Sequence, residues 1–181
     1  IYLNHGSFGP SPRSVIEARS QWQAAMESQP MDFFVRQFSD ALLVTRQRLA
    51  QFLGAQAEDL VLVENATQAM NVVANSFPLQ ANDQVLLTDH EYGAVRRIWE
   101  TTCQQAGAEV TTACLPEFFA DPQEVVDLLF AACTDRTRLI VISHITSPTA
   151  ITLPVDEICQ RAKQAGVQVC VDGPHAVAQL P

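Results

Sequence analysis

From about residue 59 onward, the chain alternates short apolar runs with longer segments in which apolar residues recur every three or four positions. Short apolar runs bounded by polar turns are typical of buried strands, and the longer spacing is typical of helices that bury one face. Strands are therefore predicted at 59–63, 84–88, 109–115, 139–143 and 167–172. Helices are predicted between them, at 68–77, 94–106, 125–133 and 154–165.

Before residue 59 the pattern is helical after an irregular start. Residues 1–13 carry two glycines and two prolines and cannot be helical throughout. A helix is predicted to open at Ser14, because Ser14 and Glu17 have the spacing of a capping box. A second amphipathic helix is predicted over 39–53, with Gly54 as its stop.

Strands that alternate with helices through short turns indicate a mostly parallel sheet with helices on both faces. The fold class predicted is α/β, a three-layer α/β/α arrangement. The domain division predicted is a lead-in segment at 1–13 and one large domain at 14–181. Because the last predicted strand and its loop stop at Pro181, this domain is expected to continue beyond that residue.

Composition narrows the class of partner. With 48% hydrophobic residues the chain can bury a sizeable core, and its net charge of -9 argues against nucleic acid or an anionic membrane as partner. No stretch has the length of a membrane span. The five cysteines are an odd number without a CxxC pair, which favours reduced thiols and a cytoplasmic protein.

Polar residues follow the predicted strands, and in a parallel sheet such loops share one edge. Asn65 to Thr67 begins a helix, where free N–H groups suit a phosphate, although a plain cap explains Asn65 equally. Tyr92 could stack on a ring or join the core. Thr146 and Ser147 offer hydroxyls, or form an ordinary connection, and Asp172 either serves a site or caps a turn.

Several common sites lack their fingerprints. The four histidines have no metal-ligand spacing, and the chain has no GxGxxG, no GxxxxGK[ST] and no GxSxG. What remains on the predicted edge is a phosphate cup, an aromatic ring, hydroxyl donors and a carboxylate. That set suits pyridoxal 5'-phosphate, whose pyridine nitrogen needs an acid to keep it protonated.

The sequence also resembles a known family. The motifs YLNHGSFGPSP, ENATQAMN, DHEYGA, SHITSPTA and VDGPHA occur in order along nearly the whole chain. They resemble the class V (fold type I) aminotransferases, which use pyridoxal phosphate, and within them the isopenicillin N epimerase-like and cysteine desulfurase-like groups. The resemblance covers only the N-terminal part of such proteins. It implies the large cofactor-binding domain of a pyridoxal phosphate-dependent transferase, here incomplete.

The resemblance implies a role for each matching residue. Asp172 would pair with the pyridinium nitrogen, and His175 would contact the phenolic oxygen of the cofactor. Tyr92 would stack on the ring, where desulfurases commonly have His. Ala66 and Thr67 would hold the phosphate.

Three further parts are implied less completely. Thr146 or Ser147 stands where desulfurases have an Asn near the ring oxygen, and the resemblance does not choose between them. The substrate-side segment would be Asn4, His5 and Gly6. The Schiff-base lysine and the substrate-carboxylate Arg would lie beyond Pro181, since the only lysine, Lys163, falls in a predicted surface helix.

The resemblance implies an enzyme that acts at the α-carbon of an amino acid or derivative, epimerase-like or aminotransferase-like, and usually a homodimer. Tyr92 and His175 favour an epimerase over a cysteine desulfurase or C–S lyase, which stays open. An alternative of another class is a non-catalytic fragment or relic that binds a phosphate ligand or a partner. A nucleotide-binding α/β module would need a glycine-rich phosphate loop, which the chain lacks.

Overall fold

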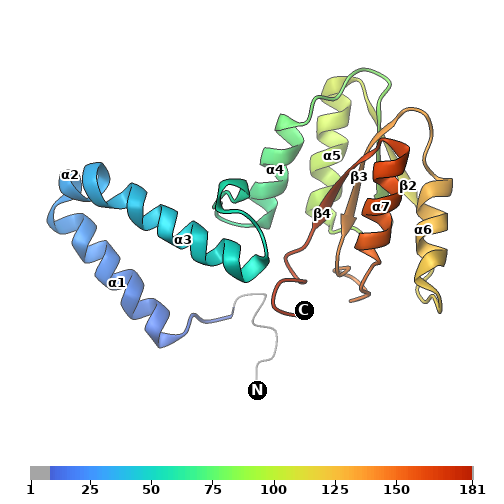
Figure 1. The fold of residues 1–181 in the computed structure, drawn as a ribbon. Helices are drawn as coiled ribbons and strands as arrows, with labels where there is room; N and C mark the ends of the chain where they lie inside the picture. The colour runs from blue at the N-terminus through green and yellow to red at the C-terminus, as the bar shows by residue number, and fades with distance from the viewer. Residues whose placement is uncertain (1–8, 181) are drawn as a thin grey trace. The chain divides into compact units, whose positions relative to one another are not determined.

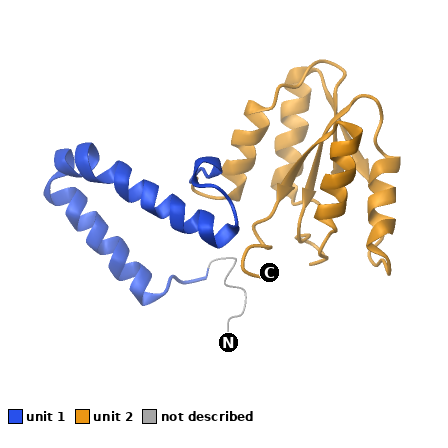
Figure 2. Ribbon diagram, in the orientation of Figure 1, with its two compact units in different colours: residues 1–62 blue, residues 63–181 orange. Residues whose placement is uncertain are grey.

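The computed structural model describes residues 9–180. Its contacts divide the chain into two compact units, residues 1–62 and residues 63–181 (Figure 2). The boundary falls inside the segment 14–181 that the sequence assigns to one domain. That this large segment binds a cofactor stays a prediction.

The first unit is helical over its described residues. Its elements are α1 (Arg13–Ser28), α2 (Pro30–Asp32), the π-helical turn η1 (Phe33–Gln37), α3 (Phe38–Leu53) and the 3-10 turn η2 (Ala57–Asp59). The end of α3 is as predicted: Gly54 adopts φ of 67°, the left-handed conformation that glycine accepts without strain.

The capping box predicted at Ser14 is wrong. The first helix begins at Arg13, and no side chain caps it. The carbonyl of Pro12 instead accepts hydrogen bonds from the N–H groups of Val15 and Ile16. Because the fixed φ of a proline suits the entry to a helix, Pro12 starts the helix before Ser14 can act as its cap.

The strand predicted at 59–63 is also wrong. Among the described residues no strand pairs with this segment, and the side chain of Val61 is 79% exposed. Leu60 does have extended backbone, which is all that a short apolar run can specify by itself. A ladder also needs a pairing partner, and the strand order of the described residues contains no partner for this segment.

The second unit is an α/β structure and confirms the predicted fold class (Figure 1). Its strands form one parallel sheet in the order β2-β1-β3-β4. They are β1 (Gln84–Thr88), β2 (Glu109–Ala113), β3 (Thr137–Ser143) and β4 (Gln168–Asp172). The helices are α4 (Ala66–Ser76), α5 (Gly93–Ala106), α6 (Pro122–Ala131) and α7 (Val155–Ala165).

The alternation of side chains along the strands divides the core into two layers. Val85 and Leu87 of β1 pack with Trp99 of α5 on one face of the sheet, the face that α4 also covers. Leu86 lies on the opposite face, in the cluster that contains Leu129 of α6 and residues of α7. Since both faces of β1 and β3 are covered, polar side chains can reach solvent only at the strand ends.

Two broader predictions can be compared with the described residues. No helix in residues 9–180 is long and apolar enough to cross a membrane. The five cysteines are free thiols, and burial raises the pKa of Cys103 to about 11, so this thiol is an unreactive core group at neutral pH.

Candidate functional site

The carboxyl ends of β1, β3 and β4 and the start of α4 lie at one edge of the sheet, here called the carboxyl edge (Figure 1). All strands run in the same direction, and α4 runs antiparallel to them before the chain enters β1. The residues predicted from the loops therefore lie at the same edge, as expected for a ligand crevice in an open α/β sheet.

The N-terminus of α4 keeps free hydrogen-bond donors. The side chain of Asn65 caps the helix by accepting from the N–H of Gln68 at 2.8 Å. Among the described residues, no acceptor is found for the N–H groups of Ala66 and Thr67, and the hydroxyl of Thr67 is also unpaired. Plain capping and an anion site are thus compatible: the cap uses one N–H and leaves two.

The turn after β1 presents one side chain to solvent and buries its neighbour. Tyr92 is 52% exposed, so it is not a core residue. Glu91, directly before it, is 7% exposed and accepts hydrogen bonds from the hydroxyl of Thr88 at 2.6 Å and that of Ser143 at 2.7 Å. Burial raises the pKa of Glu91, the negative charge of Asp172 adds to that rise, and the hydrogen bonds from Thr88 and Ser143 oppose it.

The loop after β3 separates two hydroxyls that look alike in sequence. Thr146 is 1% exposed, and its Oγ1 lies 2.7 Å from the hydroxyl of Thr149 and accepts from the N–H of Ile151 at 2.8 Å. Thr149 in turn meets Nδ1 of His90 at 3.1 Å, which ties this loop to the turn after β1. Ser147 is exposed. The hydroxyl of Thr146 thus holds the loop together, and that of Ser147 faces solvent.

Asp172 ends β4 beside Ser143, its register partner on β3. Its main-chain carbonyl accepts from the N–H of His144 at 2.9 Å, but no donor among the described residues reaches its carboxylate. Burial raises the pKa of Asp172, and the neighbouring His175 opposes that rise. A half-buried carboxylate without a donor is a costly group, and such groups concentrate at functional sites.

The remaining predicted residues fall elsewhere. Asn4, His5 and Gly6 lie outside the described residues. Lys163 is exposed in the last turn of α7, near the Gly166 that precedes β4, and so lies toward the opposite edge of the sheet. It is the surface lysine that the sequence predicts.

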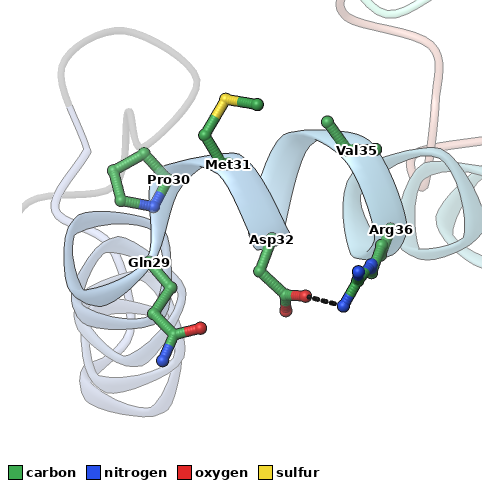
Figure 3. A pocket seen from close by; sticks show the side chains of 6 residues that line it. All are labelled: Gln29, Pro30, Met31, Asp32, Val35 and Arg36. Atoms are coloured by element: carbon green, nitrogen blue, oxygen red, sulfur yellow. Dashed lines mark hydrogen bonds and ion pairs between the residues drawn. The ribbon is translucent and has the colours of Figure 1, made fainter.

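No metal site competes with this edge. Within residues 9–180 no group of three or more His, Cys, Asp or Glu side chains could hold a metal ion. A hollow on the first unit is lined by Gln29, Pro30, Met31, Asp32, Val35 and Arg36 (Figure 3). Its only charged groups already pair with each other, at 3.1 Å between Arg36 and Asp32, so it presents no free catalytic group.

The family model for class-V aminotransferases matches residues 1–181 of the chain. The chain belongs to the class-V aminotransferase family. It is 40% identical over 176 residues to an isopenicillin N epimerase from Streptomyces clavuligerus and 42% identical over 177 residues to one from Amycolatopsis lactamdurans. It is also 32% identical over 195 residues to a putative L-cysteine desulfhydrase from Oryza sativa subsp. japonica.

The match covers most of this class-V chain and less than half of each relative. The alignments span 97%, 96% and 99% of the chain but 44%, 44% and 40% of the two epimerases and the desulfhydrase. Among solved structures, a C-DES mutant with glycine covalently linked to its PLP cofactor superposes with a TM-score of 0.90 at 23% identity. That superposition covers 99% of this chain and 48% of the C-DES chain.

A second solved structure, the cysteine desulfurase CsdA from Escherichia coli, superposes with a TM-score of 0.77 at 26% identity. It covers 94% of this chain and 44% of that one. Both neighbours agree with the predicted fold.

Sequence reasoning missed the group that joins these loops. The sequence pattern assigns no role to Glu91, whereas the structure buries it with hydrogen bonds to β1 and β3. The signal that could have found it is the Thr-x-x-Glu spacing of Thr88 and Glu91 directly after the apolar run 85–87. Ser143 could not be paired with Glu91 from local sequence, since 52 positions separate them.

Proposed function

We propose that the class-V chain forms the cofactor-binding part of a pyridoxal phosphate-dependent enzyme that acts at the α-carbon of an amino acid or derivative. The proposal rests on the combination of polar and aromatic groups at the carboxyl edge, in a chain that belongs to this family. Within residues 9–180, two N–H groups without an acceptor, an exposed phenol ring and a carboxylate without a donor lie at one end of a single parallel sheet.

These groups fit pyridoxal phosphate by their chemistry. The N–H groups of Ala66 and Thr67, with the hydroxyl of Thr67, suit a phosphate at the start of α4. Asp172 is the acceptor that a pyridine N–H needs, and no donor within residues 9–180 occupies its carboxylate. Tyr92 provides the exposed ring, and His175 stands beside Asp172 as a partner for the phenolic oxygen.

For the hydroxyl near the ring oxygen we propose Ser147. The sequence left Thr146 and Ser147 open. The hydroxyl of Thr146 already meets Thr149 and the backbone of Ile151 in a buried position, whereas Ser147 is exposed. Thr146 then acts by holding the loop, and Asn4, His5 and Gly6 remain proposed as the substrate-side segment.

When bound, pyridoxal phosphate supplies an electron sink for negative charge at the α-carbon of the substrate. Asp172 holds the proton on the pyridine nitrogen, which makes that sink effective. The start of α4 anchors the phosphate and so fixes the position of the ring. Tyr92 covers one face of the ring and restricts water, and His175 and Ser147 orient the phenolic oxygen.

The relatives favour an epimerase-like reaction. The two isopenicillin N epimerases are 40% and 42% identical to this chain, against 32% and 34% for two rice L-cysteine desulfhydrases and 30% for a cysteine desulfurase. Cysteine desulfuration or C–S lysis is the second candidate, because those relatives match over 97% or more of the chain. A homodimer in the cytoplasm is also proposed, and the free cysteines suit a reducing compartment.

The test is an absorbance spectrum of the full-length protein with added pyridoxal phosphate, before and after borohydride, with intact mass and peptide mapping. A visible band that borohydride converts into a covalent lysine adduct is expected, with the lysine outside residues 1–181. Retention of phosphate compounds without any fixed adduct would instead support a non-catalytic phosphate-binding relic and would overturn the proposal.

A further inference from the structure

The buried carboxylate of Glu91 has no part in the function proposed so far, yet it occupies a central place at the carboxyl edge. It belongs to the turn after β1, directly before Tyr92, and its two hydroxyl donors come from β1 and β3. Ser143, one of those donors, is the register partner of Asp172 on β4. Glu91 is therefore adjacent to Tyr92 in the chain and linked through Ser143 to the strand position of Asp172.

The hydrogen bonds to Glu91 indicate an ionised group. Oε1 accepts from the hydroxyl of Thr88 and Oε2 accepts from the hydroxyl of Ser143. The hydroxyl of Thr88 itself accepts from the N–H of His90 at 3.3 Å, which leaves its proton for Glu91. A carboxyl that accepts at both oxygens is satisfied as the anion, whereas a protonated carboxyl would need an acceptor for its own O–H.

The surroundings of Glu91 hold another acid and no paired cation. Asp172 and Cys170 of β4 face it, His90 lies on its own turn, and His175 stands near Asp172. The guanidinium of Arg96 from α5 approaches this strand end, but it donates to the main-chain oxygen of Thr88 at 2.7 Å and to the hydroxyl of Thr112 at 3.2 Å. Among the described residues, no Arg or Lys forms an ion pair with Glu91 or Asp172.

A buried anion without a cation lowers stability, and an apolar side chain would fill this place in the sheet at lower cost. The geometry points to a positioning role that rests on the proposed function. We propose that Glu91 is a positioning residue with two effects. It bonds the turn that carries Tyr92 to Ser143 of β3. It also adds a second negative charge near Asp172, which stabilises the protonated pyridine nitrogen of pyridoxal phosphate that Asp172 binds.

The two parts of this role, fastening and charge, are separated by two substitutions in the full-length protein. Glu91→Gln keeps a side chain that can bond both hydroxyls and removes the charge. Ser143→Ala removes one of the fastening bonds and keeps the charge. Glu100→Gln, on the exposed side of α5, removes the same charge away from the edge and serves as the matched control.

The readout is the protonation of the cofactor itself, followed by nitrogen NMR of ring-labelled pyridoxal phosphate bound to each variant across a pH series. In Glu91→Gln the pH midpoint of ring deprotonation is expected to fall by roughly one unit, within the range that a nearby charge produces. Below the midpoint of the variant, where the ring stays protonated in both proteins, the variant should retain the cofactor about tenfold less well, and this difference should vanish above the wild-type midpoint. Ser143→Ala and Glu100→Gln should keep midpoints close to that of the wild type.

Thermal melting of the apoproteins gives a second readout. Because burial holds the pKa of Glu91 above its ordinary 4.5, the stability linked to its proton is complete below pH 4.5 and is lost as pH rises through the raised pKa. Glu91→Gln should therefore melt at or above the wild-type temperature at neutral pH, with a difference that shrinks as pH falls toward 4.5.

The outcomes separate this inference from the function on which it rests. A wild-type protein that takes up no pyridoxal phosphate would overturn both. A wild type that binds it, with an unchanged midpoint in Glu91→Gln, would overturn the inference alone. A midpoint that moves in Ser143→Ala and stays in place in Glu91→Gln would also overturn it, by assigning Glu91 a purely structural role.

Discussion

Acidic side chains are paired with arginines at one edge of the sheet and are paired with no Arg or Lys at the other, among the described residues. At the amino edge, where the strands begin, acidic side chains meet arginines: Asp83 lies 3.1 Å from Arg138, and Glu109 lies 3.1 Å from Arg136. At the carboxyl edge, Glu91 accepts hydrogen bonds from Thr88 and Ser143, and among the described residues it pairs with no cation and the carboxylate of Asp172 has no donor.

The difference separates what the fold needs from what the site needs. Exposed ion pairs at the amino edge cost little to form and contribute little, whereas unpaired and partly buried carboxylates raise the free energy of the folded state. Burial raises the pKa of both Glu91 and Asp172, which is the expected sign of that cost. A sheet that neutralises one edge and keeps negative charge at the other is suited to binding a protonated ligand group there.

The largest expected effect comes from removing the acid at the end of β4. Asp172→Ala in the full-length protein should abolish turnover, because the pyridine nitrogen loses its partner. The fold should survive. Because the pKa of Asp172 is raised above 3.8, ionisation of this carboxyl lowers the stability of the wild type as pH rises. The variant has no carboxyl at this position and does not lose that stability at neutral pH. Turnover and melting temperature, measured together at neutral pH, check both statements.

Asp172→Asn is the matched control, since it keeps the size of the side chain and removes the charge. It should also be inactive. Wild-type turnover in either variant would contradict the role given to the carboxyl edge.

A smaller effect is expected at the start of α4. Thr67→Ala removes a hydroxyl from the proposed phosphate site and should weaken cofactor binding by about 1.5–3 kcal/mol, the contribution of one hydrogen bond to a charged group. Equilibrium dialysis of pyridoxal phosphate measures this change. Asn71→Ala, one turn further along the helix, also removes a polar side chain and should leave the affinity unaltered; equal losses in both variants would indicate a change in α4 as a whole.

The loop after β3 permits a comparison of two adjacent hydroxyls. Thr146→Val removes buried hydrogen bonds and should lower the free energy of unfolding by about 1–3 kcal/mol. Ser147→Ala should leave stability nearly unchanged and weaken cofactor binding by about 1 kcal/mol. Urea unfolding and cofactor titration of each variant check this division, and the reverse assignment would return Thr146 to the cofactor.

Much of the second unit could be predicted because its signals are local. The strand at 84–88 is bounded as the alternation predicts, and Gly107 and Gly166 end their helices with φ of 70° and 71°. The segment at 59–63 failed for the opposite reason. Its residues favour extended backbone, but whether a strand forms depends on a neighbour that local sequence does not specify.

The candidate site shows the same limit at the level of single side chains. The strand ends bring Tyr92 and Asp172 to one edge, and this follows from topology alone. The choice between Thr146 and Ser147 depends on burial inside a loop, and the burial of Glu91 depends on Ser143, which lies 52 positions away. Both are properties of packing between distant segments, which the hydrophobic pattern does not encode.

The smallest expected effect lies at the amino edge and completes the comparison. Arg138→Ala breaks the pair with Asp83 and should lower the free energy of unfolding by about 0.2–1 kcal/mol, the usual contribution of an exposed ion pair. The loss stays small because Asp83 keeps a second bond, from the N–H of Gln80 at 2.8 Å. Cofactor affinity and the pH midpoint of the bound ring should both match the wild type. A shifted midpoint in this variant would mean that a charge at the amino edge changes the protonation of the bound ring as much as a charge at the carboxyl edge does. The proposed difference between the two edges would then be wrong.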